Sequence, residues 1–593
     1  MKSWRIMDKD FRKGERVMPT LEWIGKSKVI NHHQEVPYRV LEHRYSYGDA
    51  DGENMIIHGD NLDALKALLP RYEGQVKCAY LDPPYNTGNE GWVYNDNVND
   101  PKIRKWLGEV VGKEGEDLTR HDKWLCMMYP RLRLLYKLHS DDGAIFISID
   151  DTEYANLKLV CDEIFGSACF VSNISWQRTY STRNDSKGIV NEVEHILCYS
   201  KQPGWMPNKL PRTAEMDALY KNPDNDITPW TSSDAFGPNA ATHQGMVYAI
   251  QHPFSGKLIY PYSGGCWRYQ QDTMLEIMNG WTEYKLQDLN DEEERAKICG
   301  VPVSDVRKGV QAIVLAKPLE TAQKEAQAVM KRGQWPRFYF TKGGKGGVRR
   351  KTYIENVSGK PPTNLWMYSE TGHTDEAKKE LIAIFNGRAP FDTPKPTRLI
   401  EFVLKVASDK NAVVLDSFAG SGTTAHAVLN MNKADEGNRK FILVEMEDYA
   451  DTITAERVKR VIDGYGDGKN AVEGTGGGFS FYDLGEPLMI DGELNEAVDV
   501  EKIREYIWFM DTRQPYVSGS PENPYLLGVH NDTAWYFYYK REEITTLNYE
   551  FLSTIPKAAG RTVIYADRCA VSDAELDNMG VTFRKIPRDI AKL

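Results

Sequence analysis

The sequence predicts an α/β fold with a mostly parallel sheet, an inserted domain and a C-terminal α+β domain. An apolar strand at 55–57, a helix with leucines at helical spacing over 62–69 and a second apolar strand at 76–81 follow one another. This strand–helix–strand order implies a parallel strand pair joined by a right-handed crossover. The same alternation returns over 393–465, so two separated stretches of the chain are expected to build one domain.

Further elements continue the alternation in the first stretch. We expect a helix over 122–143 that is interrupted near Pro130, and we expect the first helix to end at Pro70. Proline lacks the amide donor that a helix interior needs, which is the reason for both expectations. A buried strand at 143–150 and an amphipathic helix at 151–166 follow.

The places where the alternation of strands and helices stops or resumes set the expected domain boundaries. The 593 residues exceed one ordinary domain. The alternation disappears in a region rich in Pro, Gly, Trp and Tyr, whose aromatic content could build a core of its own, and a glycine cluster later marks a second boundary. We expect an irregular N-terminal extension at 1–50, the α/β domain at 51–203 and 371–472, an inserted domain at 204–370 and a C-terminal domain at 480–593.

Composition restricts the class of protein. No run of 18 uncharged apolar residues exists, and the charged N-terminus lacks the apolar segment of a signal peptide. The eight cysteines are scattered singly, without the paired spacing of a metal site. We therefore expect a cytoplasmic protein with reduced cysteines, no bound metal and no membrane partner.

One basic segment stands out from an acidic chain. The formal net charge of −11 argues against indiscriminate binding of polyanions, although local charge governs contact. Residues 331–351 carry eight Lys or Arg and no acid, with aromatic residues between them. This segment is a candidate for contact with nucleic acid, and a solvated surface loop is the alternative.

A glycine-rich turn follows the strand that begins the second α/β stretch. Gly420, Gly422 and Ala425 fit the pattern G-x-G-x-x-A between a buried strand and a helix, where glycines allow a tight turn and close approach of a ligand. Glu445 ends the next strand, where an acid can accept hydrogen bonds from ribose hydroxyls. The turn therefore fits a cofactor that contains adenosine.

The glycine-rich pattern has several possible interpretations, which are different cofactors or a purely structural turn. The sequence argues against a P-loop, because Thr423 stands where the required lysine would follow Gly422. A nicotinamide cofactor stays open, although the turn comes more than 300 residues after the first strands rather than near the start of the domain. Phe418 is bulky for a pyrophosphate cradle and suits an uncharged or sulfonium-bearing cofactor, which favours S-adenosylmethionine.

The strand at 76–81 ends abruptly in Asp82-Pro83-Pro84-Tyr85. A carboxylate and a backbone carbonyl that accept both N–H bonds of a base amino group would stabilise the positive charge developing on its nitrogen during methyl transfer. Proline supplies such a carbonyl in a stiff frame, and the tyrosine ring can stack on a flipped base. A strand-terminating turn with an Asp cap is the alternative. No Pro-Cys dipeptide occurs, which argues against a covalent cytosine-C5 mechanism.

Five motifs together resemble those of amino-group DNA methyltransferases in which the catalytic motif precedes the cofactor motif. They are HGDNLDAL (58–65), LDPPYNTGN (81–89), TPKPTRLI (393–400), DSFAGSGTT (416–424) and LVEME (443–447). Asp rather than Ser at the first catalytic position matches the adenine-N6 form. The resemblance covers about two-thirds of the chain and implies a Rossmann-like S-adenosylmethionine-dependent fold with circularly permuted motif order.

The resemblance also implies roles for individual residues. The expected catalytic residues are Asp82, Pro83, Pro84 and Tyr85. The expected cofactor-binding residues are Asp60, Lys395, Phe418, Ala419, Gly420, Ser421, Gly422, Thr423 and Glu445. The inserted domain would recognise the target sequence, with DNA-binding residues Lys342, Lys345, Arg349, Arg350 and Lys351.

The length, the long insert and the additional C-terminal domain are similar to the modification subunit of type III restriction–modification systems. That similarity implies double-stranded DNA as substrate, a homodimer, and an ATP-dependent restriction subunit as partner, with the C-terminal domain as a candidate docking or dimerisation element. A stand-alone methyltransferase, a non-catalytic DNA-specificity subunit and a nicotinamide-dependent oxidoreductase are the alternatives.

Overall fold

A computed structural model describes most of the chain. The described residues are 20–49, 53–87, 105, 109–110, 119–181, 188–490, 492–514, 516–517, 523–556 and 559–587. Residues 1–19 and 50 of the expected N-terminal extension and the end of the catalytic motif, 88–89, lie outside them. The chain divides into two compact units, one formed by Met1–Asn208 with Pro362–Leu593 and the other by Lys209–Pro361.

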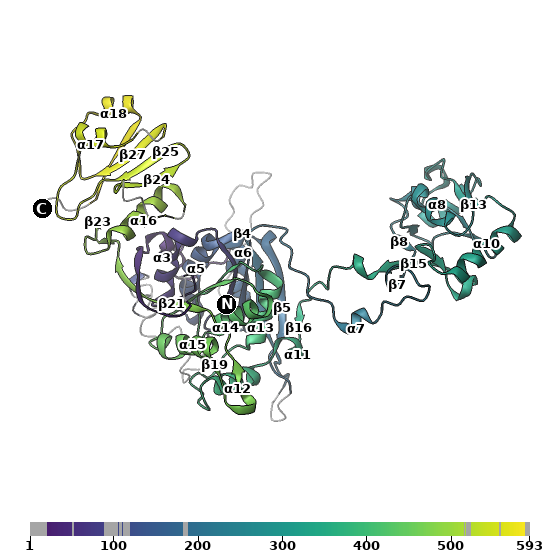
Figure 1. The fold of residues 1–593 in the computed structure, drawn as a ribbon, viewed down its shortest axis with the longest axis horizontal. Coiled ribbons are helices and arrows are strands. Elements are labelled where there is room, and N and C mark those ends of the chain that lie inside the picture. The colour runs from purple at the N-terminus through teal and green to yellow at the C-terminus, as the bar shows by residue number, and fades with distance from the viewer. Residues whose placement is uncertain are drawn as a thin grey trace, which may run out of the picture. The chain divides into compact units, whose positions relative to one another are not determined.

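The first unit is built on a ten-stranded, mostly parallel sheet (Figure 1), which confirms the predicted fold class. Six neighbouring strands, from β21 to β4 in the order below, run parallel to one another. In spatial order the strands are β1 (Arg39–Gly48), β21 (Gly478–Pro487), β2 (Met55–His58), β18 (Lys440–Glu445), β17 (Val413–Asp416), β3 (Val76–Leu81), β4 (His139–Ile149), β6 (Val193–Ser200), β5 (Phe170–Gln177) and β16 (Leu365–Trp366).

The side of this sheet formed by β1 and β21 differs from expectation in two ways. Residues 39–48, expected to be irregular, form β1, which pairs antiparallel with β21. Tyr45 stacks on Phe481 across this pair, so aromatic side chains stabilise the strand. Its charged residues had made this segment read as irregular. Strand β21 continues to Pro487 within the main sheet, so residues 480–487, which were expected in the C-terminal domain, belong to this sheet.

Helices cover both faces of the sheet. One buried cluster joins β-strand side chains to the helices α3 (Asn61–Tyr72), α5 (Arg120–Leu138) and α6 (Tyr154–Phe165). A second group is formed by α13 (Thr397–Ala407), α14 (Thr423–Asp435) and α15 (Glu456–Asp463), whose buried residues do not belong to that cluster. Further helices of this unit are α1 (Lys26–Val29), α2 (His32–Glu35), α11 (Tyr368–Thr371) and α12 (Thr374–Ile384).

The two prolines do not end their helices. Pro70 lies inside α3, and Pro130 lies inside α5, where both side chains are buried. A capping box between Thr119 and Asp122 starts α5, and twelve of its nineteen residues are buried. The packing of these buried side chains stabilises α5 by more than the loss of one backbone hydrogen bond at Pro130 destabilises it. The predicted interruption at Pro130 is therefore wrong.

The second unit has an aromatic core of its own. Trp230, Trp267, Trp281 and Phe338 are among its buried residues. Its strands are β7 (Trp230–Ser233), β8 (Phe236–Pro238), β9 (Ile250–Gln251), β10 (Leu258–Ile259), β11 (Gly265–Trp267), β12 (Tyr284–Gln287), β13 (Ala312–Leu315), β14 (Phe338–Phe340) and β15 (Val348–Tyr353). Its helices are α7 (Ala214–Asp217), α8 (Gln271–Asn279), α9 (Glu292–Cys299) and α10 (Leu319–Arg332). This unit lies within the insert expected at 204–370.

The C-terminal part carries a separate four-stranded sheet. Its strands, in spatial order, are β24 (Leu526–His530), β25 (Thr533–Phe537), β27 (Arg561–Ala566) and β29 (Val581–Lys585). The last three are parallel, and two apolar clusters pack against them. The helices of this part are α16 (Val500–Thr512), α17 (Tyr549–Thr554) and α18 (Asp573–Met579).

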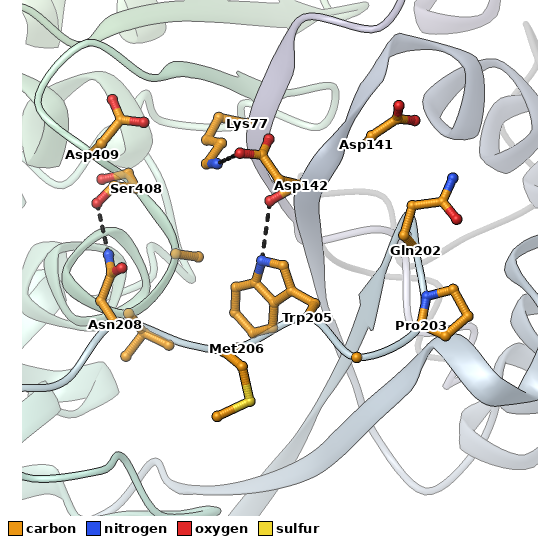
Figure 2. A pocket seen from close by; sticks show the side chains of 13 residues that line it. Lys77, Asp141, Asp142, Gln202, Pro203, Trp205, Met206, Asn208, Ser408 and Asp409 are labelled. Atoms are coloured by element: carbon orange, nitrogen blue, oxygen red, sulfur yellow. Dashed lines mark hydrogen bonds and ion pairs between the residues drawn. The ribbon is translucent and has the colours of Figure 1, made fainter.

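A groove lies at the amino-terminal end of β3. Lys77 forms an ion pair there with Asp142, and the indole nitrogen of Trp205 donates a hydrogen bond of 3.1 Å to the Asp142 carbonyl (Figure 2). Asn208 Nδ2 donates to the Ser408 carbonyl at 2.9 Å. Because Lys77 is near the start of β3 and Asp82 follows its end, this groove and the catalytic motif lie at opposite ends of the strand.

No described helix is long and apolar enough to cross a membrane.

Candidate functional site

The catalytic and cofactor motifs meet at the carboxyl ends of two neighbouring strands of the sheet. Strands β3 and β17 are parallel neighbours, with Leu415 opposite Ala79, although more than 300 residues separate them in sequence. Asp82 follows the end of β3, and the glycine-rich turn follows Asp416 at the end of β17. Ligands of open α/β sheets bind at this carboxyl edge.

Asp82 lies in a tight cluster of polar side chains. The Lys395 ammonium nitrogen is 2.7 Å from both carboxylate oxygens of Asp82 and 2.9 Å from the Tyr85 hydroxyl. The Tyr85 hydroxyl donates to Asp82 Oδ1 at 2.8 Å. The side chain of Asp82 is 18% exposed and that of Lys395 is 11% exposed. Asp82, which was predicted to be catalytic, and Lys395, which was predicted to bind the cofactor, thus belong to one cluster.

Glu194 completes this cluster and was not among the predicted residues. Its Oε1 atom is 3.2 Å from the Lys395 nitrogen, and the Tyr85 hydroxyl also contacts it. Strand β6 is antiparallel to β4, with His195 opposite Ile149, so the first residues of β6 reach the carboxyl edge. An acid at the start of an otherwise apolar strand was the only sequence signal for this position.

Burial and charge set the ionisation of the cluster. Burial raises the pKa of Asp82, the Lys395 ammonium opposes that rise and the Glu194 carboxylate adds to it. Burial alone would lower the pKa of Lys395, but Asp82 and Glu194 raise it above its usual value. Burial also raises the pKa of Tyr85 well above its usual value, so this hydroxyl stays protonated near neutral pH.

The two proline carbonyls are not equivalent. The Pro84 carbonyl accepts a hydrogen bond of 2.7 Å from the indole of Trp124, whose side chain is fully buried. Asn86, which has a positive φ of 60°, then turns the chain and donates to the buried Glu153 carboxylate. Trp124 therefore engages the Pro84 carbonyl, whereas no hydrogen bond among the described residues engages the Pro83 carbonyl.

The glycine-rich turn is held by the acid predicted to contact ribose. Gly420 has a φ of 52°, which L side chains rarely adopt, and its amide donates to Glu445 Oε2 at 2.8 Å. The Glu447 amide donates to the other oxygen of Glu445 at 3.0 Å. Burial raises the pKa of Glu445 and that of Asp416 to about 7.

A buried arginine supports the same turn and was also missed. Arg457, which is fully buried, donates to Ser421 Oγ at 3.0 Å and to Thr423 Oγ1 at 2.8 Å. Its second terminal nitrogen contacts the Glu380 carboxylate at 3.2 Å and the Thr397 hydroxyl at 3.0 Å. The arginine therefore connects the turn to the start of α13, which follows Lys395.

One small cavity collects most of the predicted cofactor residues. It is lined by Tyr80, Asp82, Phe391, Thr393, Pro394, Lys395, Asp416, Phe418, Ala419, Gly420, Ser421, Thr423 and Thr424. Asp60, Gly422 and Glu445 do not line it. Asp60 caps α3 through the Leu62 amide and forms an ion pair of 3.1 Å with Arg131, while Gly422, with a φ of 81°, caps α14.

The basic segment of the second unit is only partly available to a ligand. The side chains of Lys342 and Lys345 are exposed, and those of Arg349 and Arg350 are half-buried, with Arg349 ion-paired to Asp234. Lys351 is fully buried, where its nitrogen contacts the Asp224 and Asp226 carboxylates. The prediction that Lys351 contacts DNA is wrong, because its charge neutralises buried acids.

No group of three or more His, Cys, Asp or Glu among the described residues could hold a metal ion. Seven cysteines are buried thiols and Cys569 is partly exposed.

Comparison with known proteins places this geometry in a family. The model of the DNA methylase family matches residues 76–456, which includes both β3 and the glycine-rich turn. The chain belongs to the DNA methylase family. That membership confirms the resemblance drawn from the five motifs.

Relatives of this DNA methylase include both type III and type II enzymes. The Mod subunit of the type III restriction-modification enzyme StyLTI of Salmonella typhimurium is 32% identical over 74% of this chain and 62% of its own length. The EcoPI Mod subunit of Escherichia phage P1 is 28% identical over 72% and 64%, respectively. The type II methyltransferase M.KpnI of Klebsiella pneumoniae is 30% identical over 66% and 80%. The chain spans less than two-thirds of the Mod subunits it matches.

Proposed function

We propose that this chain methylates adenine N6 in double-stranded DNA, with S-adenosylmethionine as the methyl donor. The observation that carries the proposal is the adjacency of the Asp82 cluster and the Gly420 turn at the ends of two parallel strands. An acceptor for an amino group and a turn suited to an adenosine-containing cofactor thus face one cavity. The base must leave the duplex to reach a buried carboxylate.

The residues at the turn fit the proposed cofactor. Ser417 Oγ is buried, and no described group hydrogen-bonds to it, so a polar ligand atom can take that place. Glu445 would accept from the ribose hydroxyls, and Phe418 and Gly420 would hold the methionine part. When bound, S-adenosylmethionine supplies a methyl carbon to the nitrogen lone pair while its bond to sulfur breaks and leaves the electron pair on sulfur.

The chain's own residues prepare the amino nitrogen for attack. Asp82 and the Pro83 carbonyl would accept its two N–H bonds, which opposes delocalisation of the lone pair into the ring. Asp82 then receives the proton that the nitrogen loses after the new bond forms and passes it to water. The ring of Tyr85 would lie against the base. Asp82 rather than serine favours adenine over cytosine.

We further propose that the chain is the modification subunit of a type III system. Its relatives include three Mod subunits of such systems. In this assignment the chain forms a homodimer, binds an ATP-dependent restriction subunit and recognises its target through residues 209–361. The match to M.KpnI favours a stand-alone methyltransferase as the second candidate. Sedimentation of the chain alone tests the dimer.

The ionisation of Glu445 gives a pH prediction for cofactor affinity. Below the pKa of about 7, Glu445 takes up a proton and loses acceptor capacity, so affinity for S-adenosylmethionine should fall as the pH falls. From pH 8 to pH 6 the fall should be about tenfold for one such group. Calorimetric titration at the two pH values measures it.

The Glu445→Gln variant is the matched control, because its amide accepts hydrogen bonds at both pH values. Its affinity should depend less on pH than that of the wild type, with Asp416 contributing equally to both proteins. An identical pH dependence in the two proteins contradicts the role of Glu445.

The exposed lysines of the second unit give a prediction for DNA binding. The double substitution Lys342→Ala/Lys345→Ala should weaken DNA binding and reduce the slope of log K against log salt by about two, because two phosphate contacts are lost. Fluorescence anisotropy over a salt series measures the slope. Lys297→Ala/Lys308→Ala, an exposed pair elsewhere in the same unit, is the control. Equal slopes for all three proteins count against contact by this segment.

The proposed activity is tested by supplying the cofactors separately. The chain should bind S-adenosylmethionine, bind NAD far more weakly, and transfer a labelled methyl group to duplex DNA. Tight binding of NAD instead would favour an oxidoreductase. Binding of DNA without methyl transfer would favour a specificity subunit.

A further inference from the structure

Two carboxylates, one half-buried and one buried, share the same cationic partner at the candidate site. Lys395 contacts Asp82 at 2.7 Å and Glu194 at 3.2 Å, and Tyr85 contacts both acids through its hydroxyl. The side chain of Glu194 is only 3% exposed. The desolvation of so deeply buried a carboxylate has to be offset by an opposite charge and hydrogen bonds. Lys395 and Tyr85 supply these at the carboxyl ends of the strands.

The charges of this cluster do not cancel. Asp82 and Lys395 alone would form a neutral pair, which would stabilise a cation beside it poorly. Glu194 adds a second negative charge, so the three groups sum to one negative charge. Arg178 lies 3.7 Å from Glu194 on its outer side, but it is 36% exposed and its charge is screened by solvent.

The remaining titratable groups around Asp82 leave this sum nearly unchanged. Burial raises the pKa values of Tyr80 and Tyr85 well above their usual range, so both are neutral near pH 7. Asp416, beyond the turn, has a pKa raised to about 7 by burial and contributes only part of a charge. Glu194 is therefore the group that keeps the cluster anionic.

The hydrogen bonds of Asp82 leave an acceptor position free on Oδ2. A carboxylate offers about four lone-pair sites. Lys395 occupies one site on each oxygen, and Tyr85 occupies a second site on Oδ1 when its single proton points to Asp82 rather than to Glu194. The last site on Oδ2 can accept one amino N–H, and the Pro83 carbonyl can accept the other. This arrangement holds only while Lys395 keeps its place, and Glu194 is its second carboxylate partner.

We propose that Glu194 is a positioning residue for methyl transfer, which holds Lys395 against Asp82 and keeps a net negative charge beside the amino nitrogen. The inference rests on the proposed function, since it assigns Asp82 as the acceptor. Glu194 touches neither base nor cofactor in this scheme and acts through Lys395 and Asp82. The positive charge that develops on the attacked nitrogen is then met by an anionic cluster and not by a neutral ion pair.

The test compares Glu194→Gln with Glu194→Asp in the full chain. The Gln variant keeps a hydrogen-bond acceptor and removes the charge, so kcat for methyl transfer should fall about tenfold or more. Affinity for S-adenosylmethionine should stay within about twofold. The Asp variant keeps the charge and should recover part of the lost rate. Glu192→Gln, the same change two residues away, is the control and should retain the wild-type rate.

The pH profile separates this role from a packing role. The Glu194 charge raises the pKa of Asp82, so its removal lowers that pKa and should move the acid limb of kcat against pH to lower pH. A variant that is merely destabilised loses rate without moving the limb. An unchanged rate and an unchanged acid limb in Glu194→Gln overturn the inference if the wild type methylates DNA. A wild type that transfers no methyl group removes the proposed function itself.

Discussion

Replacing Asp82 by alanine should lower the rate of methyl transfer by about a thousandfold or more, while affinity for S-adenosylmethionine stays within about twofold. The substitution removes the carboxylate that would accept an amino N–H, and it leaves the glycine-rich turn untouched. Lys395 keeps Glu194 as a partner, so the fold loses one of two ion pairs at this position. Single-turnover transfer of a labelled methyl group and calorimetry measure the two quantities.

Asp82→Asn is the matched control for this substitution. It keeps the shape of the side chain and one acceptor oxygen while it removes the charge. Its rate should lie between those of the wild type and the alanine variant, because part of the hydrogen bonding survives. Turnover at the wild-type rate in Asp82→Ala would remove the assigned role.

Replacing Gly420 by valine should lower affinity for S-adenosylmethionine by about a hundredfold or more. Gly420 has a φ of 52° and lines the cavity shared with Asp82, so a β-branched residue there is strained and changes the shape of the turn. The turn also loses the geometry that directs the Gly420 amide toward Glu445. Calorimetric titration with S-adenosylmethionine measures the loss.

Gly300→Val separates backbone strain from loss of the site. Gly300 caps α9 in the other unit with a φ of 66°, and open space surrounds the position of an added Cβ. Its replacement should cost similar stability and leave cofactor affinity unchanged. If Gly420→Val binds S-adenosylmethionine as the wild type does, the turn is not part of the cofactor site.

The site at the carboxyl ends of β3 and β17 could be predicted because each of its motifs can be recognised in a short stretch of sequence. Asp82 and its prolines end an apolar strand, and Gly420 sits between a strand and a helix, so each motif reports its own position. Parallel strands in turn place such ends at one edge. The sequence therefore contained enough to bring two motifs more than 300 residues apart to one site.

The residues that were missed depend on contacts between distant segments. Glu194 gains its place from the antiparallel direction of β6, and Arg457 from the packing of α15 against the glycine-rich turn. Lys351 was misassigned because a basic run does not reveal which lysine is buried against Asp224. Strand β1 was missed because its pairing partner, β21, lies more than 400 residues away.

Single-molecule sequencing of DNA from cells that express this chain tests the central claim most directly. It should detect N6-methyladenine within one recurring sequence, and the mark should be absent from cells that express the Asp82→Ala variant. DNA without any modified base, or with methyl groups on cytosine alone, would contradict the assignment of this chain as an adenine methyltransferase.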